Sequence, residues 1–216
     1  MKRDSDEYTA AAEKREKKEK YHKMLEAHGI SRRYWGCTFD GIKNKGIPAA
    51  CQKEYDKCWE YARNFAEYQK KGIGILMMGP VGTMKTSLSA AIAHAVIRQR
   101  KSVQFVPMAE LLDQMLKMSR NPDPAEYMNF ENRIRTADLL IIDDLGAEYP
   151  TAWARNKVDA IITGRYNRML PMIVTTNLDP GSMKDTYIER TYDRLKGTSL
   201  VMRFSGESLR KAPEEG

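Results

Sequence analysis

The segment at residues 79–86 constrains the fold more than any other part of the sequence. It follows a short apolar run at residues 73–78 and leads into an amphipathic stretch at residues 85–100. A strand, a glycine-containing turn and a helix in this order are typical of a phosphate-binding loop, because backbone N–H groups and the helix N-terminus both favour an anion. The predicted phosphate-binding residues are Gly79, Pro80, Val81, Gly82, Thr83, Met84, Lys85 and Thr86.

The end of this loop predicts the cofactors ATP and Mg²⁺. Lys85 is expected to bridge the β- and γ-phosphates, and the Thr86 hydroxyl is expected to ligate Mg²⁺. Position 84 departs from the G-x-x-x-x-G-K-T pattern, because Met replaces the second glycine. A Met held in the left-handed conformation costs about 1–2 kcal/mol, roughly tenfold in affinity. A side chain that blocks the phosphates abolishes binding, whereas one that points away permits it, and both readings stay open.

Strands and helices alternate along most of the chain. Apolar runs predict strands at 73–78, 103–106, 139–142, 172–176 and 199–204, and helical periodicity predicts helices at 49–71, 85–100, 108–118, 125–136, 152–169 and 189–195. This alternation predicts an α/β fold, a parallel sheet of about five strands with helices on both faces. We divide the chain into a charged N-terminal arm (1–30), a lead-in linker and amphipathic helix (31–72) and a core (73–216), and expect a short strand or two within 31–48.

Polar residues follow two of the predicted strands. Four apolar residues at 139–142 precede Asp143 and Asp144, and the run at 172–176 precedes Asn177. The carboxyl ends of parallel strands form the ligand-binding edge of such a sheet, beside the phosphate-binding loop. We expect Asp143 to hold Mg²⁺, Asp144 to orient the attacking water and Asn177 to lie near the γ-phosphate.

Composition limits the class of protein. The net charge is +7, which weakly favours contact with phosphate backbones. The sequence contains no run of about 18 apolar residues, and its N-terminus has no apolar core of the signal-peptide type. Cys37, Cys51 and Cys58 lack the spacing of a zinc site, which favours free thiols. We expect a cytoplasmic protein with no membrane partner.

Taken together, these motifs give the chain a specific resemblance over residues 31–210. It resembles the AAA+ domain of DnaC-type and DnaI-type helicase loaders, and it is similar to the related IstB transposition helper ATPases. The P-loop fold with a minimal C-terminal lid is implied by this resemblance. So are two further roles: Arg194 as an arginine finger that reaches the ATP of a neighbouring subunit, with Arg190 as a weaker candidate, and Arg210 as a sensor 2 residue near the phosphates.

The resemblance implies an ATPase that loads or remodels the replicative helicase on single-stranded DNA and self-associates through nucleotide-bridged interfaces. The candidate DNA path is residues 115–130, with Lys117, Arg120 and Tyr127, although an ordinary surface helix pair fits equally well. Two alternatives stay open. One is an IstB-like helper that binds duplex DNA. The other is a scaffold that is insensitive to nucleotide because of Met84. Asp144 also favours weak turnover, because its side chain is shorter than the Glu that most AAA+ proteins have at this position.

Overall fold

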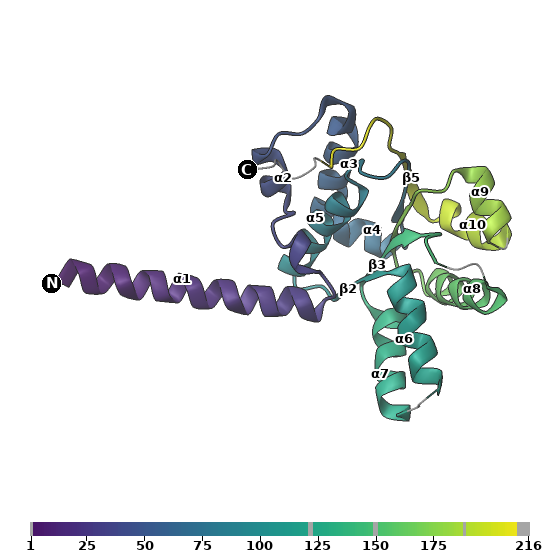
Figure 1. The fold of residues 1–216 in the computed structure, drawn as a ribbon, viewed down its shortest axis with the longest axis horizontal. Coiled ribbons are helices and arrows are strands. Elements are labelled where there is room, and N and C mark those ends of the chain that lie inside the picture. Colours follow the sequence, from purple (N-terminus) through teal and green to yellow (C-terminus); the bar gives the residue numbers. More distant parts are fainter. Residues whose placement is uncertain (1, 121–122, 149–150, 188, 211–216) are drawn as a thin grey trace.

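Five parallel strands form a single sheet at the centre of the molecule. A computed structural model describes residues 2–120, 123–148, 151–187 and 189–210 (Figure 1). The strands lie in the order β2-β3-β4-β1-β5. Every neighbouring pair is parallel, which confirms the predicted sheet. Their bounds are β1 (Gly74–Met78), β2 (Val103–Pro107), β3 (Leu139–Leu145), β4 (Met172–Thr176) and β5 (Ser199–Arg203).

Helices precede the first strand and connect the later ones. The helices before the sheet are α1 (Lys2–Ala27), the short 3-10 helices η1 (Arg32–Tyr34) and η2 (Ala49–Cys51), α2 (Phe39–Asn44), α3 (Gln52–Arg63) and α4 (Phe65–Lys71). Those after β1 are α5 (Lys85–Arg98), α6 (Met108–Arg120), α7 (Pro124–Thr136), α8 (Ala152–Asn167), α9 (Pro180–Thr186) and α10 (Glu189–Gly197).

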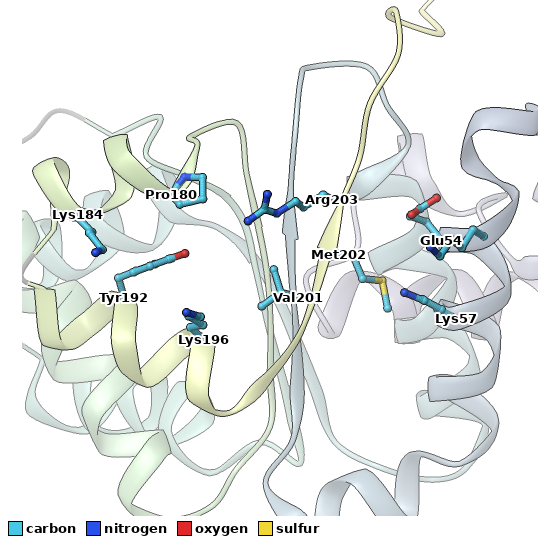
Figure 2. A pocket seen from close by; sticks show the side chains of 10 residues that line it. Glu54, Lys57, Pro180, Lys184, Tyr192, Lys196, Val201, Met202 and Arg203 are labelled. Atoms are coloured by element: carbon cyan, nitrogen blue, oxygen red, sulfur yellow. The ribbon is translucent and has the colours of Figure 1, made fainter.

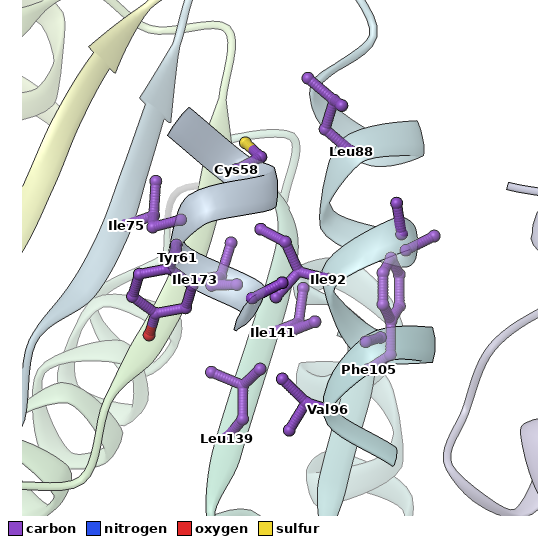
Figure 3. Close-up of a cluster of buried hydrophobic side chains, with 14 of the residues drawn as sticks. Cys58, Tyr61, Ile75, Leu88, Ile92, Val96, Phe105, Leu139, Ile141 and Ile173 are labelled. Carbon is purple, nitrogen blue, oxygen red and sulfur yellow. The ribbon is translucent and has the colours of Figure 1, made fainter. Parts of the chain in front are cut away.

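Alternating strand residues divide the hydrophobic core into two halves. Ile75, Ile141 and Ile173 pack against α3 and α5 on one face (Figure 3). Their neighbours Leu76 and Ile142 pack against the helices α6 to α10 on the other face. Because successive side chains of a strand point to opposite faces, one apolar run supplies both halves. This three-layer arrangement places the carboxyl ends of β1, β4 and β3 next to one another.

The N-terminal half of the chain differs from the prediction at two places. Residues 31–48 contain η1 and α2, so the predicted short strands are wrong. The Thr38 side chain accepts a hydrogen bond from the Gly41 backbone N–H and caps α2, which explains a helix there. The helix predicted over 49–71 is interrupted at Asn64, whose φ of −101° and ψ of 22° are not helical. Gly72 ends α4 in the left-handed conformation, which glycine adopts without steric penalty.

Later boundaries differ by smaller amounts. The helices α5 and α8 end before the predicted residues 100 and 169, and Arg100 and Met169 both have positive φ. Helix α9 was not predicted. Asp179 caps it by accepting from the backbone N–H groups of Gly181 and Ser182.

Two parts project from the body in Figure 1: the long helix α1 and the pair α6 and α7. Residues 12–20 of α1 are exposed, whereas its C-terminal end joins the core through the fully buried Leu25. The Tyr21 hydroxyl lies 2.7 Å from Nδ1 of His94, and the His22 ring stacks on Trp35. Among the described helices, none is long and apolar enough to cross a membrane.

Candidate functional site

A cavity of about 630 Å³ lies at the carboxyl ends of β1, β3 and β4. Six of the eight predicted phosphate-binding residues line it: Val81, Gly82, Thr83, Met84, Lys85 and Thr86. Gly79 and Pro80 do not line the cavity, and they contact Lys85 through their carbonyl groups instead. The fold therefore brings the predicted loop to the edge of the sheet at which parallel α/β proteins bind ligands.

Lys85 is held at the centre of this site. Its Nζ donates to the Gly79 carbonyl at 2.6 Å and to the Pro80 carbonyl at 2.7 Å. It also donates to Asn177 Oδ1 at 2.9 Å. Burial lowers the pKa of Lys85, and the two carboxylates at the end of β3 partly oppose that change. A positive charge is thus fixed where the loop's backbone turns around the cavity.

Met84 occupies the position at which the loop pattern has glycine. Its φ of 70° and ψ of 3° place it in the left-handed region, so the strain expected from the sequence is present. Its side chain is half-buried and packs against the core cluster that includes Leu88, while it also lines the cavity. The left-handed conformation of Met84 therefore costs about 1–2 kcal/mol of folding free energy, which the packing of its side chain partly offsets.

Asp143 is the buried acid of the pair on β3. Its exposed fraction is 8%, and it accepts a hydrogen bond of 2.7 Å from the Thr175 hydroxyl. Burial raises the pKa of Asp143, whereas the hydroxyls of Thr175 and Thr86 act in the opposite direction. Thr86 and Asp143, the two predicted Mg²⁺ ligands, both line the cavity. A hydroxyl beside a carboxylate is a donor set that suits this hard cation.

Asp144 is the exposed acid of the pair and has a positive φ of 57°. Pairing between β3 and β4 shifts register between Ile142 and Leu145, so the irregularity turns Asp144 toward the cavity wall. Its backbone N–H donates to Thr175 Oγ1 at 2.9 Å, and its carboxylate accepts from Asn177 Nδ2 at 2.8 Å. Asn177 thus connects Lys85 with Asp144.

The C-terminal segment closes one side of the loop. The Leu209 backbone N–H donates to the Gly82 carbonyl at 3.0 Å, and Arg210 lines the cavity. A Cβ atom built at Gly82, where φ is 79°, would lie 2.1 Å from Oγ of Ser208. Glycine is therefore required at this position by the returning chain as well as by the backbone angle.

Several cavity residues were not among the predicted site residues. Arg33, Tyr34 and Pro48 come from the lead-in segment, and they line the cavity opposite the strand ends. Burial, followed by the charge of Asp143, raises the pKa of Tyr34. Thr175 was known only as part of an apolar run, although it contacts both acids. The signal that could have identified Thr175 is a hydroxyl residue near the end of one predicted strand, since the ends of parallel strands meet and two carboxylates follow another strand.

Arg194 lies apart from the cavity. It does not line it, and its guanidinium donates to Thr163 Oγ1 at 2.6 Å and lies 3.5 Å from Asp159 Oδ1. Asp159 also accepts from Arg190 at 2.8 Å and from the Thr191 hydroxyl at 2.7 Å. These hydrogen bonds lower the pKa of Asp159 despite its partial burial. One carboxylate on α8 therefore holds both arginines of α10.

The candidate DNA path falls on the projecting pair α6 and α7, although residues 121 and 122 within it lie outside the described residues. Lys117 forms an ion pair with Asp113 at 2.6 Å, and Arg120 is exposed near the end of α6. Tyr127 is half-buried, and the neighbouring Met128 is 61% exposed. DNA contact by this surface stays a prediction.

A comparison with models of protein families shows the family of this chain. The model of the family described as IstB-like ATP binding protein matches residues 63–215. The chain belongs to this family. Among curated relatives, it is 28% identical over 195 residues to the replicative helicase loader DnaC of Buchnera aphidicola subsp. Baizongia pistaciae. That alignment covers 89% of this chain and 76% of the relative.

Solved structures share the fold of this IstB-like protein. The crystal structure of the DnaC helicase loader aligns with a TM-score of 0.69 at 21% identity, covering 81% of this chain and all of that chain. The crystal structure of DnaI aligns with a TM-score of 0.65 at 24% identity, covering 83% of this chain and 94% of that one. These matches confirm the P-loop AAA+ fold and the predicted resemblance to DnaC and DnaI.

Proposed function

We propose that this IstB-like protein binds and hydrolyses ATP with Mg²⁺ and loads the replicative helicase onto single-stranded DNA. Several chains would associate through interfaces that contain nucleotide, so that Arg194 of one chain acts on the nucleotide held by another. The helicase as partner rests on the names of the DnaC relatives, and DNA as partner rests on the net charge of +7 and the projecting α6–α7 pair.

One observation supports ATP chemistry most directly: a cation, two carboxylates, a hydroxyl and an amide converge on one cavity. Lys85 would bind the β- and γ-phosphates, and Thr86 with Asp143 would hold Mg²⁺. The metal, when bound, would neutralise charge on the phosphates. Asp144 would orient the attacking water and accept its proton, and the hydrogen bond that its carboxylate accepts from Asn177 supports this role. Arg210 would add a second positive charge near the phosphates.

Met84 supports a second candidate, a scaffold with the same fold that does not respond to nucleotide. Its side chain lines the same cavity that the phosphates would enter. Against that reading, the side chain also packs against the core, which limits how far it can swing into the cavity. The third reading is an IstB-like helper that binds duplex DNA, and membership of the IstB-like family keeps it as an alternative.

A thermal shift measurement separates these readings. The wild type, Lys85→Ala and Met84→Gly are heated with ATP or ADP, each with Mg²⁺, and Lys17→Ala on the exposed part of α1 is the matched control. A ligand at about 100 times its Kd stabilises the native state by roughly 2.7 kcal/mol. We expect ATP to raise the Tm of the wild type and of Lys17→Ala, and to leave that of Lys85→Ala unchanged.

The other outcomes point to the alternatives. A response by Met84→Gly alone would mean that the natural loop is blocked, and the scaffold reading would replace the ATPase. If the wild type responds, labelled single-stranded and duplex DNA of equal length are compared next. A clear preference for duplex DNA, without binding to a replicative helicase, would favour the transposition helper.

A further inference from the structure

A second cavity, of about 550 Å³, lies over the outer strand β5 and shares no residue with the nucleotide cavity. Figure 2 shows that β5 forms its floor, with α3 on one side and α9 with α10 on the other. Val201 and Arg203 point toward the α10 side, and Met202 points toward the α3 side. The hollow is thus a groove along the edge of the sheet, between the two layers of helices.

Both walls of the groove are basic. Lys53 and Lys57 of α3 line one side, Lys184 of α9 and Lys196 of α10 line the other, and Arg203 rises from the floor; Glu54 is the carboxylate among the lining residues. In the described parts of the chain, no carboxylate lies within ion-pair distance of these five cations. Five cations beside a single lining carboxylate repel one another, and a bound anion would relieve that repulsion.

The floor of the groove is an open strand edge. β5 pairs with β1 on one side and is the last strand of the sheet among the described residues. Leu200 and Val201 are 36% and 37% exposed, which is high for apolar residues of a strand. An exposed edge offers unpaired backbone N–H and C=O groups, and these are the groups that a further strand binds.

From these features we propose that the groove binds an extended, acidic peptide segment of a partner protein, which adds to the sheet beside β5. Side chains of an added strand would alternate between the two walls. Because both walls are basic, acidic residues at successive positions would each meet a lysine. The apolar side chain of Val201, which lines the groove, would contact the remaining residues of the peptide.

A nucleic acid fits the groove less well. Single-stranded DNA binds through aromatic side chains on which bases stack, as well as through cations. Among the described residues that line the groove, Tyr192 is the one aromatic residue, and only 8% of it is exposed. A phosphate chain could accept hydrogen bonds from the unpaired N–H groups of β5, but it has no donor for the unpaired C=O groups, whereas an added strand pairs with both. The groove therefore favours a peptide over DNA.

Fluorescence anisotropy tests the proposal with a labelled peptide of about eight residues, the length of a typical strand. The peptide contains mostly Glu with two Val residues. A second peptide has Gln in place of Glu, and a third keeps the Glu residues but is N-methylated at alternate positions, so that it cannot pair as a strand. A labelled oligo-dT of similar length tests the nucleic-acid reading.

We expect the acidic peptide to bind the wild type and the other two peptides to bind at least about tenfold more weakly, since charge and backbone pairing both contribute. The double variant Lys57→Glu/Lys196→Glu, which changes one residue on each wall, should weaken peptide binding by about tenfold or more. Lys17→Glu on α1 should not weaken it. Oligo-dT binding should be the same in the wild type and the double variant.

Hydrogen exchange supplies a readout that needs no variant. Binding of the acidic peptide should slow exchange of the β5 amides at residues 199–203. Absence of peptide binding at millimolar concentration, equal binding of the N-methylated peptide, or protection away from β5 would each overturn the proposal. A loss of oligo-dT binding in the double variant, with peptide binding unchanged, would show instead that the groove is a DNA surface.

Discussion

The nucleotide cavity and the cluster around Asp159 use the same kinds of residue in different ways. In the cavity, Lys85, Asn177 and Asp144 form a continuous chain of hydrogen bonds within one molecule. In the cluster, Arg194 is bound to Thr163 and Asp159 on α8, away from that chain. The cavity is complete within one chain, whereas the role predicted for Arg194 requires the nucleotide of a second chain.

The two regions differ in whether their predicted role needs a second chain. The residues that line the cavity are positioned by the fold of their own chain. The ion pair with Asp159 and the hydrogen bond to Thr163 restrict the rotamers of Arg194. The two regions therefore predict different behaviour when each is altered and when altered chains are mixed.

Arg194→Ala should have the largest effect on turnover. Loss of an arginine finger lowers phosphoryl transfer by about 10³-fold or more, since charge on the transferring group is no longer neutralised. Nucleotide affinity of a single chain should change little, because Arg194 does not line its own cavity. Steady-state phosphate release and equilibrium binding of a fluorescent ATP analogue measure the two effects separately.

Mixing tests whether Arg194 acts on another chain. Lys85→Ala chains retain Arg194 but should not bind ATP, and Arg194→Ala chains bind ATP but lack the arginine. Mixed assemblies should recover part of the turnover that neither variant shows alone. If mixing restores no turnover at any ratio of the two variants, Arg194 does not act on the nucleotide of another chain.

Asp144→Asn should have the next largest effect. Asn tolerates the left-handed conformation at this position at least as well as Asp, so the backbone should be preserved. The substitution removes the carboxylate that would accept a proton, which lowers turnover by about 10²-fold. ATP binding should stay within about twofold of the wild type, since the phosphate contacts remain. Phosphate release is measured beside Asp185→Asn, an exposed control on α9.

Met84 allows a smaller prediction about stability. Met84→Gly removes about 1–2 kcal/mol of left-handed strain but also loses packing and gains unfolded-state entropy, so the net change should be within about 1 kcal/mol. Met84→Ala keeps the strain and loses the packing, and it should be less stable than Met84→Gly by about 1 kcal/mol. Urea unfolding of both variants gives the difference. Equal stability of the two would mean that φ at this position relaxes in solution.

The sequence was sufficient where one local signal determined the structure. Apolar runs located all five strands, and Asp143 and Asn177 were placed at the correct strand ends because parallel topology aligns them. The strain at Met84 followed from a single missing glycine. In each case the evidence was contained in a few adjacent residues.

The prediction failed or fell short where distant segments determine the structure. Tyr34 reaches the cavity from the lead-in, and Asp159 meets Arg190 across 31 positions of sequence, so neither contact leaves a local pattern. The break at Asn64 divides a helix whose apolar periodicity continues through it. Helix α9 is a different case, because Asp179 followed by Pro180 is a helix-start signal that was present and overlooked.

The smallest expected effect concerns the pH dependence of Mg²⁺ binding at Asp143. Burial raises the pKa of this carboxyl, and a metal ligand must be deprotonated, so Mg²⁺-dependent ATP binding should weaken as the pH falls through that pKa. The Thr175 hydroxyl donates to the carboxylate and stabilises its charged form. Thr175→Val removes this donor, and the pKa should rise further. The weakening should then begin at a higher pH than in the wild type.

Isothermal titration of ATP with and without Mg²⁺ across a pH series measures the shift. Thr175→Ser retains a hydroxyl and should restore the wild-type profile, which distinguishes the hydrogen bond from a general disturbance of β4. Arg194→Ala should leave the profile unchanged, because Arg194 lies outside the cavity. An identical pH profile in Thr175→Val and the wild type would mean that Thr175 contributes to the backbone position of Asp144 and not to the charge of Asp143.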